Sequence, residues 1–133
     1  MSIVADTHVL VWHLSADDRM GSRARARLER SLAREELYVS VMSFWEIALL
    51  TSHGRLRLEG TATSFRRRVL DMGIRELPVG GEVALQAASL GPVLVDPVDC
   101  IVAATALAHG ASLVTADRRL LAARVVDVTD ARR

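Results

Sequence analysis

Lysine is absent from this chain of 133 residues, although the chain carries seventeen basic side chains. All seventeen are therefore arginine. The absence of lysine excludes mechanisms that need its amine, such as Schiff-base catalysis and phosphate binding by a Walker-type loop. Arginine binds phosphate through a planar array of donors, so contacts with phosphorylated molecules remain open.

Cysteine is almost as scarce, because Cys100 is the only one. A single cysteine forms neither an internal disulfide nor a cysteine-based zinc site, so we expect a reducing, cytoplasmic location. No apolar run approaches the ~20 residues needed to cross a bilayer, and the first residues lack the pattern of a secretory signal. The net charge of +1 does not by itself indicate a nucleic-acid partner.

Short apolar segments alternate along the chain with segments of helical periodicity. The apolar segments predict strands at residues 3–5, 37–41, 74–77, 111–115 and 125–128. Segments such as 22–36 and 62–72 instead repeat apolar residues at helical spacing. This alternation predicts an α/β fold for residues 1–133, as a single domain with a short, mostly parallel central sheet flanked by helices on both faces.

Acidic residues follow the ends of several apolar segments. They are Asp6, Glu46, Asp99 and Asp117, with Asp96 near the third of them. The carboxyl ends of parallel strands meet at one edge of a sheet, so these acids are expected to converge. Each also has a purely structural explanation as part of a helix start, and Glu46 has the spacing of a capping box that opens at Ser43.

Converging carboxylates favour a bound cation. Like charges that share a site raise one another's pKa, and a divalent cation removes the conflict. Mg²⁺ prefers oxygen ligands and retained water, and Mn²⁺ accepts similar ligands. A cation held by carboxylates is a common apparatus for phosphodiester hydrolysis, so the acids predict a Mg²⁺ or Mn²⁺ site.

Taken together, these motifs resemble the PIN-domain family, and in particular the VapC-type toxins of toxin–antitoxin pairs. The resemblance runs essentially end to end. Its segments are DTHVL from Asp6, Trp45-Glu46, DPVDCIVAA from Asp96, and Thr115-Ala116-Asp117. It implies an endoribonuclease that hydrolyses RNA phosphodiesters with water activated by Mg²⁺ or Mn²⁺.

The resemblance also implies roles for individual side chains. Asp6 and Asp99 are expected to be the principal metal ligands, and Glu46 and Asp117 to complete the metal-binding and catalytic pocket. The supporting residues are expected to be Asp96, Thr7 and Thr115, with the two threonines orienting water or phosphate. The family further implies inhibition by a cognate antitoxin protein, whose tail can push an arginine into the acidic pocket, and assembly as a homodimer.

One local pattern departs from the family. Many relatives carry an aromatic and a basic residue around the third acid, in a pattern like Asp-Pro-Phe-Asp-Arg. Val98 and Cys100 stand at those places. The metal-binding acids survive this change, but a local contact with phosphate is expected to be missing.

Arginines elsewhere are the expected contacts with the RNA backbone. The candidates are Arg66, Arg67, Arg68 and Arg118. Three consecutive arginines cannot share one face of a helix, so part of this charge is expected to face solvent. Trp12 and Trp45 are expected in the core.

Two other functions stay open at this point. An aspartyl-nucleophile phosphatase could use Asp6, but such enzymes need a second aspartate two positions later or a lysine, and the chain has His8 and no lysine. A non-catalytic protein-interaction module of the same fold would use its acids only as helix caps.

Overall fold

Five short strands and seven helices alternate along the chain in a computed structural model that describes all 133 residues. The strands are β1 (Ile3–Ala5), β2 (Leu37–Ser40), β3 (Arg75–Leu77), β4 (Ser112–Thr115) and β5 (Val128–Asp130). The helices are α1 (Thr7–Ser15), α2 (Ser22–Ala33), α3 (Val41–Ser52), α4 (Ala62–Asp71), α5 (Gly81–Ser89), α6 (Pro97–Ala108) and α7 (Arg118–Ala123). None of the helices has the length and apolar character needed to span a membrane.

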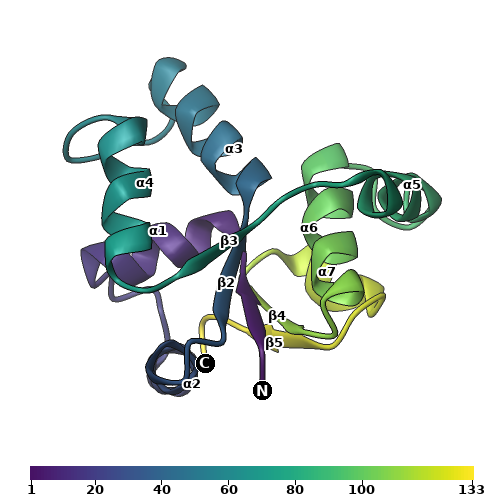
Figure 1. Cartoon of the computed structure of the whole chain (residues 1–133), viewed down its shortest axis with the longest axis horizontal. Coiled ribbons are helices and arrows are strands. Elements are labelled where there is room, and N and C mark those ends of the chain that lie inside the picture. Colours follow the sequence, from purple (N-terminus) through teal and green to yellow (C-terminus); the bar gives the residue numbers. More distant parts are fainter.

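The strands form one sheet in the order β3-β2-β1-β4-β5. Every neighbouring pair is parallel, so the expected mostly parallel sheet is parallel throughout. Helices α1 to α4 lie on one side of the sheet and α5 to α7 on the other (Figure 1). The strand order reverses between β1 and β4. Open parallel sheets place their ligand sites at such a reversal, beyond the carboxyl ends of the strands.

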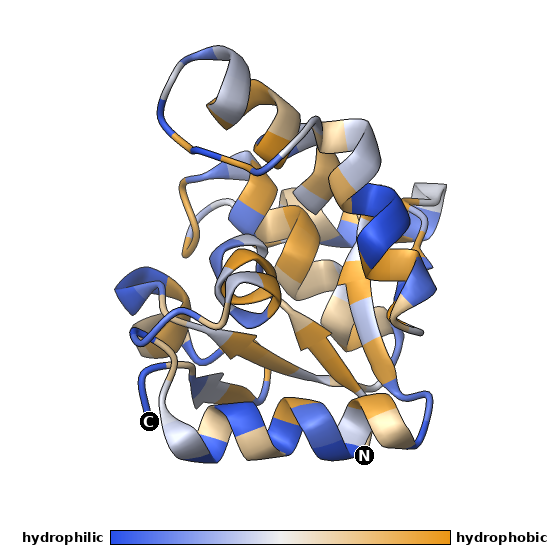
Figure 2. Cartoon of the chain, turned by 90° about the vertical axis from the view of Figure 1, so that its left-hand side faces the viewer, coloured by the Kyte–Doolittle hydropathy of each residue, from blue (hydrophilic) through white to orange (hydrophobic).

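Side chains of alternate residues along the strands divide between two apolar cores. Ile3 and Ala5 of β1 and Val114 of β4 join the core beneath α1 to α4. Val4 and Leu113, which point the other way, join the core beneath α5 to α7. Figure 2 shows the strands as largely hydrophobic, whereas α2 at the base of the molecule carries many hydrophilic residues. The sheet is therefore buried on both faces, and its short strands are held by packing against helices.

The expected start of α3 is wrong. The helix begins at Val41, and Ser40 is its N-cap, with the Ser40 hydroxyl accepting a hydrogen bond from the amide of Met42 at 3.2 Å. The predicted capping box between Ser43 and Glu46 therefore does not form. Ser43 lies inside the helix and is fully buried, which leaves its hydroxyl free for a contact with another element.

Trp45 is also placed differently from the expectation. Its side chain is 53% exposed, whereas Ser43 and Ile47 on the same helix are buried. Residues two positions apart on a helix face different directions, so Trp45 lies on the outer face of α3. Trp12, by contrast, lies in the core as predicted.

The segment before α6 is a turn, and one expected strand is shifted along the chain. The carbonyl of Leu90 accepts hydrogen bonds from the amides of both Val93 and Leu94, which closes the turn. The last strand is Val128–Asp130 rather than 125–128, and it pairs in register with Leu113–Thr115 of β4. Asp99 thus reaches the edge of the sheet at the start of α6 and not at the end of a strand.

Candidate active site

Asp6 occupies the junction between β1 and α1, and both of its carboxylate oxygens are held. Oδ1 accepts a hydrogen bond from the amide of Thr7 at 2.8 Å, and Oδ2 accepts one from the hydroxyl of Thr115 at 2.7 Å. The residue is only 8% exposed. The neighbouring strand β4 therefore sets the orientation of this carboxylate, because Thr115 is the last residue of that strand.

The two threonines predicted to support the site connect its parts. Besides donating to Asp6, the hydroxyl of Thr115 accepts a hydrogen bond from the amide of Asp117 at 3.0 Å. The hydroxyl of Thr7 donates to the hydroxyl of Ser43 at 2.9 Å. Thr7 thereby ties α1 to α3, the helix that carries Glu46. Sequence reasoning assigned Ser43 to a helix cap and missed this contact between elements.

The start of α6 brings two further acids to the same edge. Asp96 is the N-cap, and its Oδ1 accepts hydrogen bonds from the amides of Val98 at 2.8 Å and Asp99 at 3.2 Å. Pro97 takes the first helical position, and Asp99 lies in the first turn, as the sequence predicts. The carboxylate of Asp99 forms no hydrogen bond with the protein, so it is available to a ligand.

All five acids line one cavity of about 580 Å³. They are Asp6, Glu46, Asp96, Asp99 and Asp117. The cavity is bordered by basic side chains, which are His8, Arg19, Arg55, Arg119 and Arg132. Residues separated by more than a hundred positions thus meet at the carboxyl edge of the sheet, in an acidic pocket with a basic border.

Burial and crowding of charge make three of these carboxyl groups, those of Asp6, Glu46 and Asp99, hard to ionise. Burial, followed by the negative charges of Asp6, Asp117, Asp96 and Glu46, raises the pKa of Asp99 to about 7. Burial also raises the pKa of Asp6, although its hydrogen bonds from Thr115 and Thr7 act in the opposite direction. The pKa of Glu46 is raised by burial and by the charge of Asp6. The pocket therefore stabilises any cation that enters it.

The donor set fits a hard divalent cation. Every acidic ligand offers oxygen, which Mg²⁺ and Mn²⁺ prefer. No three His, Cys, Asp or Glu side chains lie close enough together to enclose a metal ion. Mg²⁺ is commonly bound through one or two carboxylates with several waters retained, so a closed cage of protein ligands is not required.

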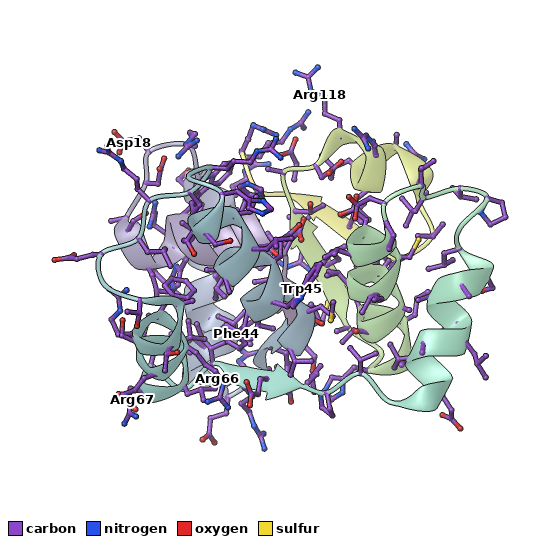
Figure 3. All side chains as sticks on the ribbon, turned by 90° about the horizontal axis from the view of Figure 1, so that it is seen from above. Asp18, Phe44, Trp45, Arg66, Arg67 and Arg118 are labelled. Carbon is purple, nitrogen blue, oxygen red and sulfur yellow. The ribbon has the colours of Figure 1, made fainter.

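The arginines predicted to bind RNA do not line this cavity. Arg66 forms an ion pair with Glu76 at 2.5 Å, and Arg68 donates to the carbonyl of Glu59 at 2.9 Å. Figure 3 shows Arg66 and Arg67 at one margin of the molecule and Arg118 projecting outward at another. The basic border is made by other arginines, which the sequence did not single out because no local motif marks them.

The fold and the site together define a single α/β domain with a parallel five-stranded sheet and a pocket of acids at the carboxyl edge of that sheet. The family model described as the PIN domain matches residues 3–126. The chain therefore belongs to the PIN-domain family.

Among curated proteins, the chain is similar to Ribonuclease VapC22 of Mycobacterium tuberculosis. The two are 31% identical over 123 residues, which cover 90% of this chain and 89% of the relative.

Two solved structures share the fold. The structure of VapBC-1 from nontypeable Haemophilus influenzae aligns over 100% of both chains with a TM-score of 0.69 and 16% identity. That of VapBC2 from Rickettsia felis, bound to a DNA fragment from their promoter, covers 97% of this chain and 98% of the other, with a TM-score of 0.69 and 14% identity.

Proposed function

We propose that this protein is a divalent-metal-dependent endoribonuclease that acts as the toxin of a toxin–antitoxin pair. One observation carries the proposal: five carboxylates line a single cavity, where burial and then the neighbouring negative charges raise the pKa of Asp99 to about 7. Such a cavity favours the binding of a cation, and a bound cation would favour the binding of a negatively charged phosphodiester beside it. The similarity to a protein named as a ribonuclease supports RNA as the substrate.

The side chains have distinct roles in this proposal. Asp6 and Asp99 would hold Mg²⁺ or Mn²⁺, and Glu46 and Asp117 would complete the ligand set directly or through water. When bound, the cation would supply a nucleophile at neutral pH and would offset the charge that develops on the phosphate. Thr115 holds the Asp6 carboxylate in place at 2.7 Å. Thr7 fixes the position of α3, and through it that of Glu46.

We also propose two protein partners. Leu85 and Val95 are exposed apolar side chains on α5 and the segment after it, which supports a homodimer through this surface. Trp45 and Leu49 form an exposed apolar strip on α3, which supports contact with a cognate antitoxin. A structural neighbour described as a toxin–antitoxin complex from Klebsiella pneumoniae agrees with such a partner. We also propose a cytoplasmic location, which is consistent with an RNA substrate.

The chemistry of the product ends tests the proposal. Purified protein is incubated with a mixed RNA pool and Mg²⁺ or Mn²⁺, and a parallel sample contains EDTA. We expect cleavage only with the metal, giving 5′-phosphate ends, because water attacks the phosphorus and the 3′ oxygen leaves. Products with a 2′,3′-cyclic phosphate contradict this mechanism. An acyl-phosphate trapped on Asp6 would favour the phosphatase, and a folded, metal-loaded protein without cleavage would favour an interaction module.

A further inference from the structure

Arg132 is held at the border of the acidic cavity although it lies far from the acids in sequence. Its guanidinium donates a hydrogen bond to the carbonyl of Ala116 and lies 5.7 Å from the centre of the Trp12 ring. The backbone beside it is anchored by Ala131, which is fully buried and donates its amide to the carbonyl of Thr115 at 2.8 Å. The side chain is therefore ordered before any ligand binds.

The charge of Arg132 has no carboxylate partner. Five acids line the same cavity, yet none of them forms an ion pair with Arg132. A guanidinium has five N–H donors, and the Ala116 carbonyl takes one of them. The remaining donors are free to form the paired hydrogen bonds that arginine makes with phosphate.

The other arginines of the border lack this combination. Arg19 also lies over the Trp12 ring, at 5.1 Å, but its charge is paired with Asp17 at 2.7 Å. The side chains of Arg55 and Arg119 make no hydrogen bond that fixes them. Arg132 is therefore the border arginine that is both ordered and free of a counter-ion.

We propose that Arg132 binds a backbone phosphate of the RNA beside the one that is cleaved. This inference rests on the proposed function. The phosphate that reacts has to lie at the carboxylates, which Arg132 does not contact, so Arg132 meets a neighbouring phosphate. Such a contact is equally strong before and during the reaction, and it therefore affects KM rather than kcat.

The test compares two neighbouring arginines. Arg132→Gln removes the charge and the terminal guanidinium nitrogen that donates to the Ala116 carbonyl, and it keeps an unbranched polar side chain. Arg133→Gln is the matched control, since the Arg133 side chain lines a separate hollow with Arg23 and Arg27. We expect Arg132→Gln to raise KM about ten-fold with kcat unchanged, the size expected for loss of one hydrogen-bonded charge. Arg133→Gln should behave as the wild type.

Binding without cleavage gives a second readout. The affinity for a fluorescent single-stranded RNA is measured in EDTA at several salt concentrations. Loss of one phosphate contact should reduce the slope of log affinity against log salt by about 0.7 in Arg132→Gln. Arg132→Lys tests the same contact if the glutamine variant folds poorly. It should bind less tightly than the wild type, because an ammonium cannot make the paired hydrogen bonds.

The outcomes separate this inference from the proposed function. If the wild type cleaves RNA and Arg132→Gln has the same KM, affinity and salt slope, the inference is wrong and the function stands. If Arg132→Gln binds Mn²⁺ more tightly and cleaves faster, Arg132 is an internal counter-ion, which also contradicts the inference. A wild type that neither binds nor cleaves RNA overturns both.

Discussion

Replacing Thr115 by valine isolates the hydrogen bonds that organise the acidic pocket. Valine has nearly the shape of threonine but no hydroxyl. The change removes the donor to Asp6 at 2.7 Å and the acceptor for the amide of Asp117 at 3.0 Å. Because both groups belong to the proposed metal site, Thr115→Val should loosen the site and also destabilise the fold.

The size of the effect follows from these two contacts. A hydrogen bond to a charged group contributes about 1.5–3 kcal/mol, and the partly exposed amide of Asp117 adds about 1 kcal/mol at most. We therefore expect the free energy of unfolding to fall by about 2–4 kcal/mol at pH 8. The loss should be smaller at pH 5, because the bond from Thr115 lowers the pKa of Asp6 by favouring its ionised form.

Urea unfolding in the presence of EDTA measures this loss, and Thr105→Val provides the control. Thr105 is also buried, but its hydroxyl donates to the carbonyl of Ile101 within α6 at 2.7 Å and forms no hydrogen bond with an acid. We expect the control to lose about 1 kcal/mol or less. If Thr115→Val loses no more than Thr105→Val, Thr115 does not hold the pocket together and the reasoning is wrong.

Two further predictions concern charge and packing. In EDTA, Asp99→Asn should match the wild-type stability near pH 4 and exceed it at pH 8. The pKa of Asp99 is raised from its ordinary value of 3.8 to about 7 in the folded protein, so the wild type loses stability as the pH rises between these two values. If Asp99→Asn is already fully more stable than the wild type at pH 4, this reasoning is contradicted. Gly21→Ala should cost about 1–3 kcal/mol in urea unfolding, since its Cβ would lie 2.1 Å from the carbonyl carbon of Arg133. Gly80→Ala, with open space at its Cβ, is the control, and equal losses would refute the packing argument.

The convergence of the acids could be predicted because each follows a local rule. Asp6 comes directly after β1 and Asp117 lies two positions after the end of β4, in one parallel sheet, and the cap position of Asp96 fixes where Asp99 lies on α6. Parallel strands joined by right-handed crossovers then bring these positions to one edge. Sequence-local signals and the topology of the sheet are sufficient for this part of the site.

The start of α3 could not be predicted in the same way. Ser40 and Ser43 are both acceptable helix caps, and local spacing favours Ser43 because Glu46 follows it at capping-box distance. The structure uses Ser40 instead, and Ser43 accepts the hydroxyl of Thr7 from another helix. Local spacing does not encode this contact between helices, so the sequence alone could not show that the helix begins at Val41 and not after Ser43.

The basic border was missed for a related reason. Arg132 reaches the cavity because β5 pairs with β4 and the chain after it folds back over Trp12. No spacing within the sequence links Arg132 to Trp12 or to Ala116. The run Arg66–Arg68 is conspicuous in the sequence, but Arg66 is paired with Glu76 on β3 and lies outside the cavity.

The central claim is that the acidic pocket is a metal-dependent nuclease site. Calorimetric titration of Mn²⁺, followed by an RNA cleavage assay on the same samples, tests this claim most directly. The variants are Asp99→Asn and, as the control, Asp71→Asn, which removes an exposed carboxylate at the end of α4. We expect the wild type and Asp71→Asn to bind Mn²⁺ and cleave RNA, and Asp99→Asn to lose both. Unchanged Mn²⁺ affinity and cleavage in Asp99→Asn would contradict the claim.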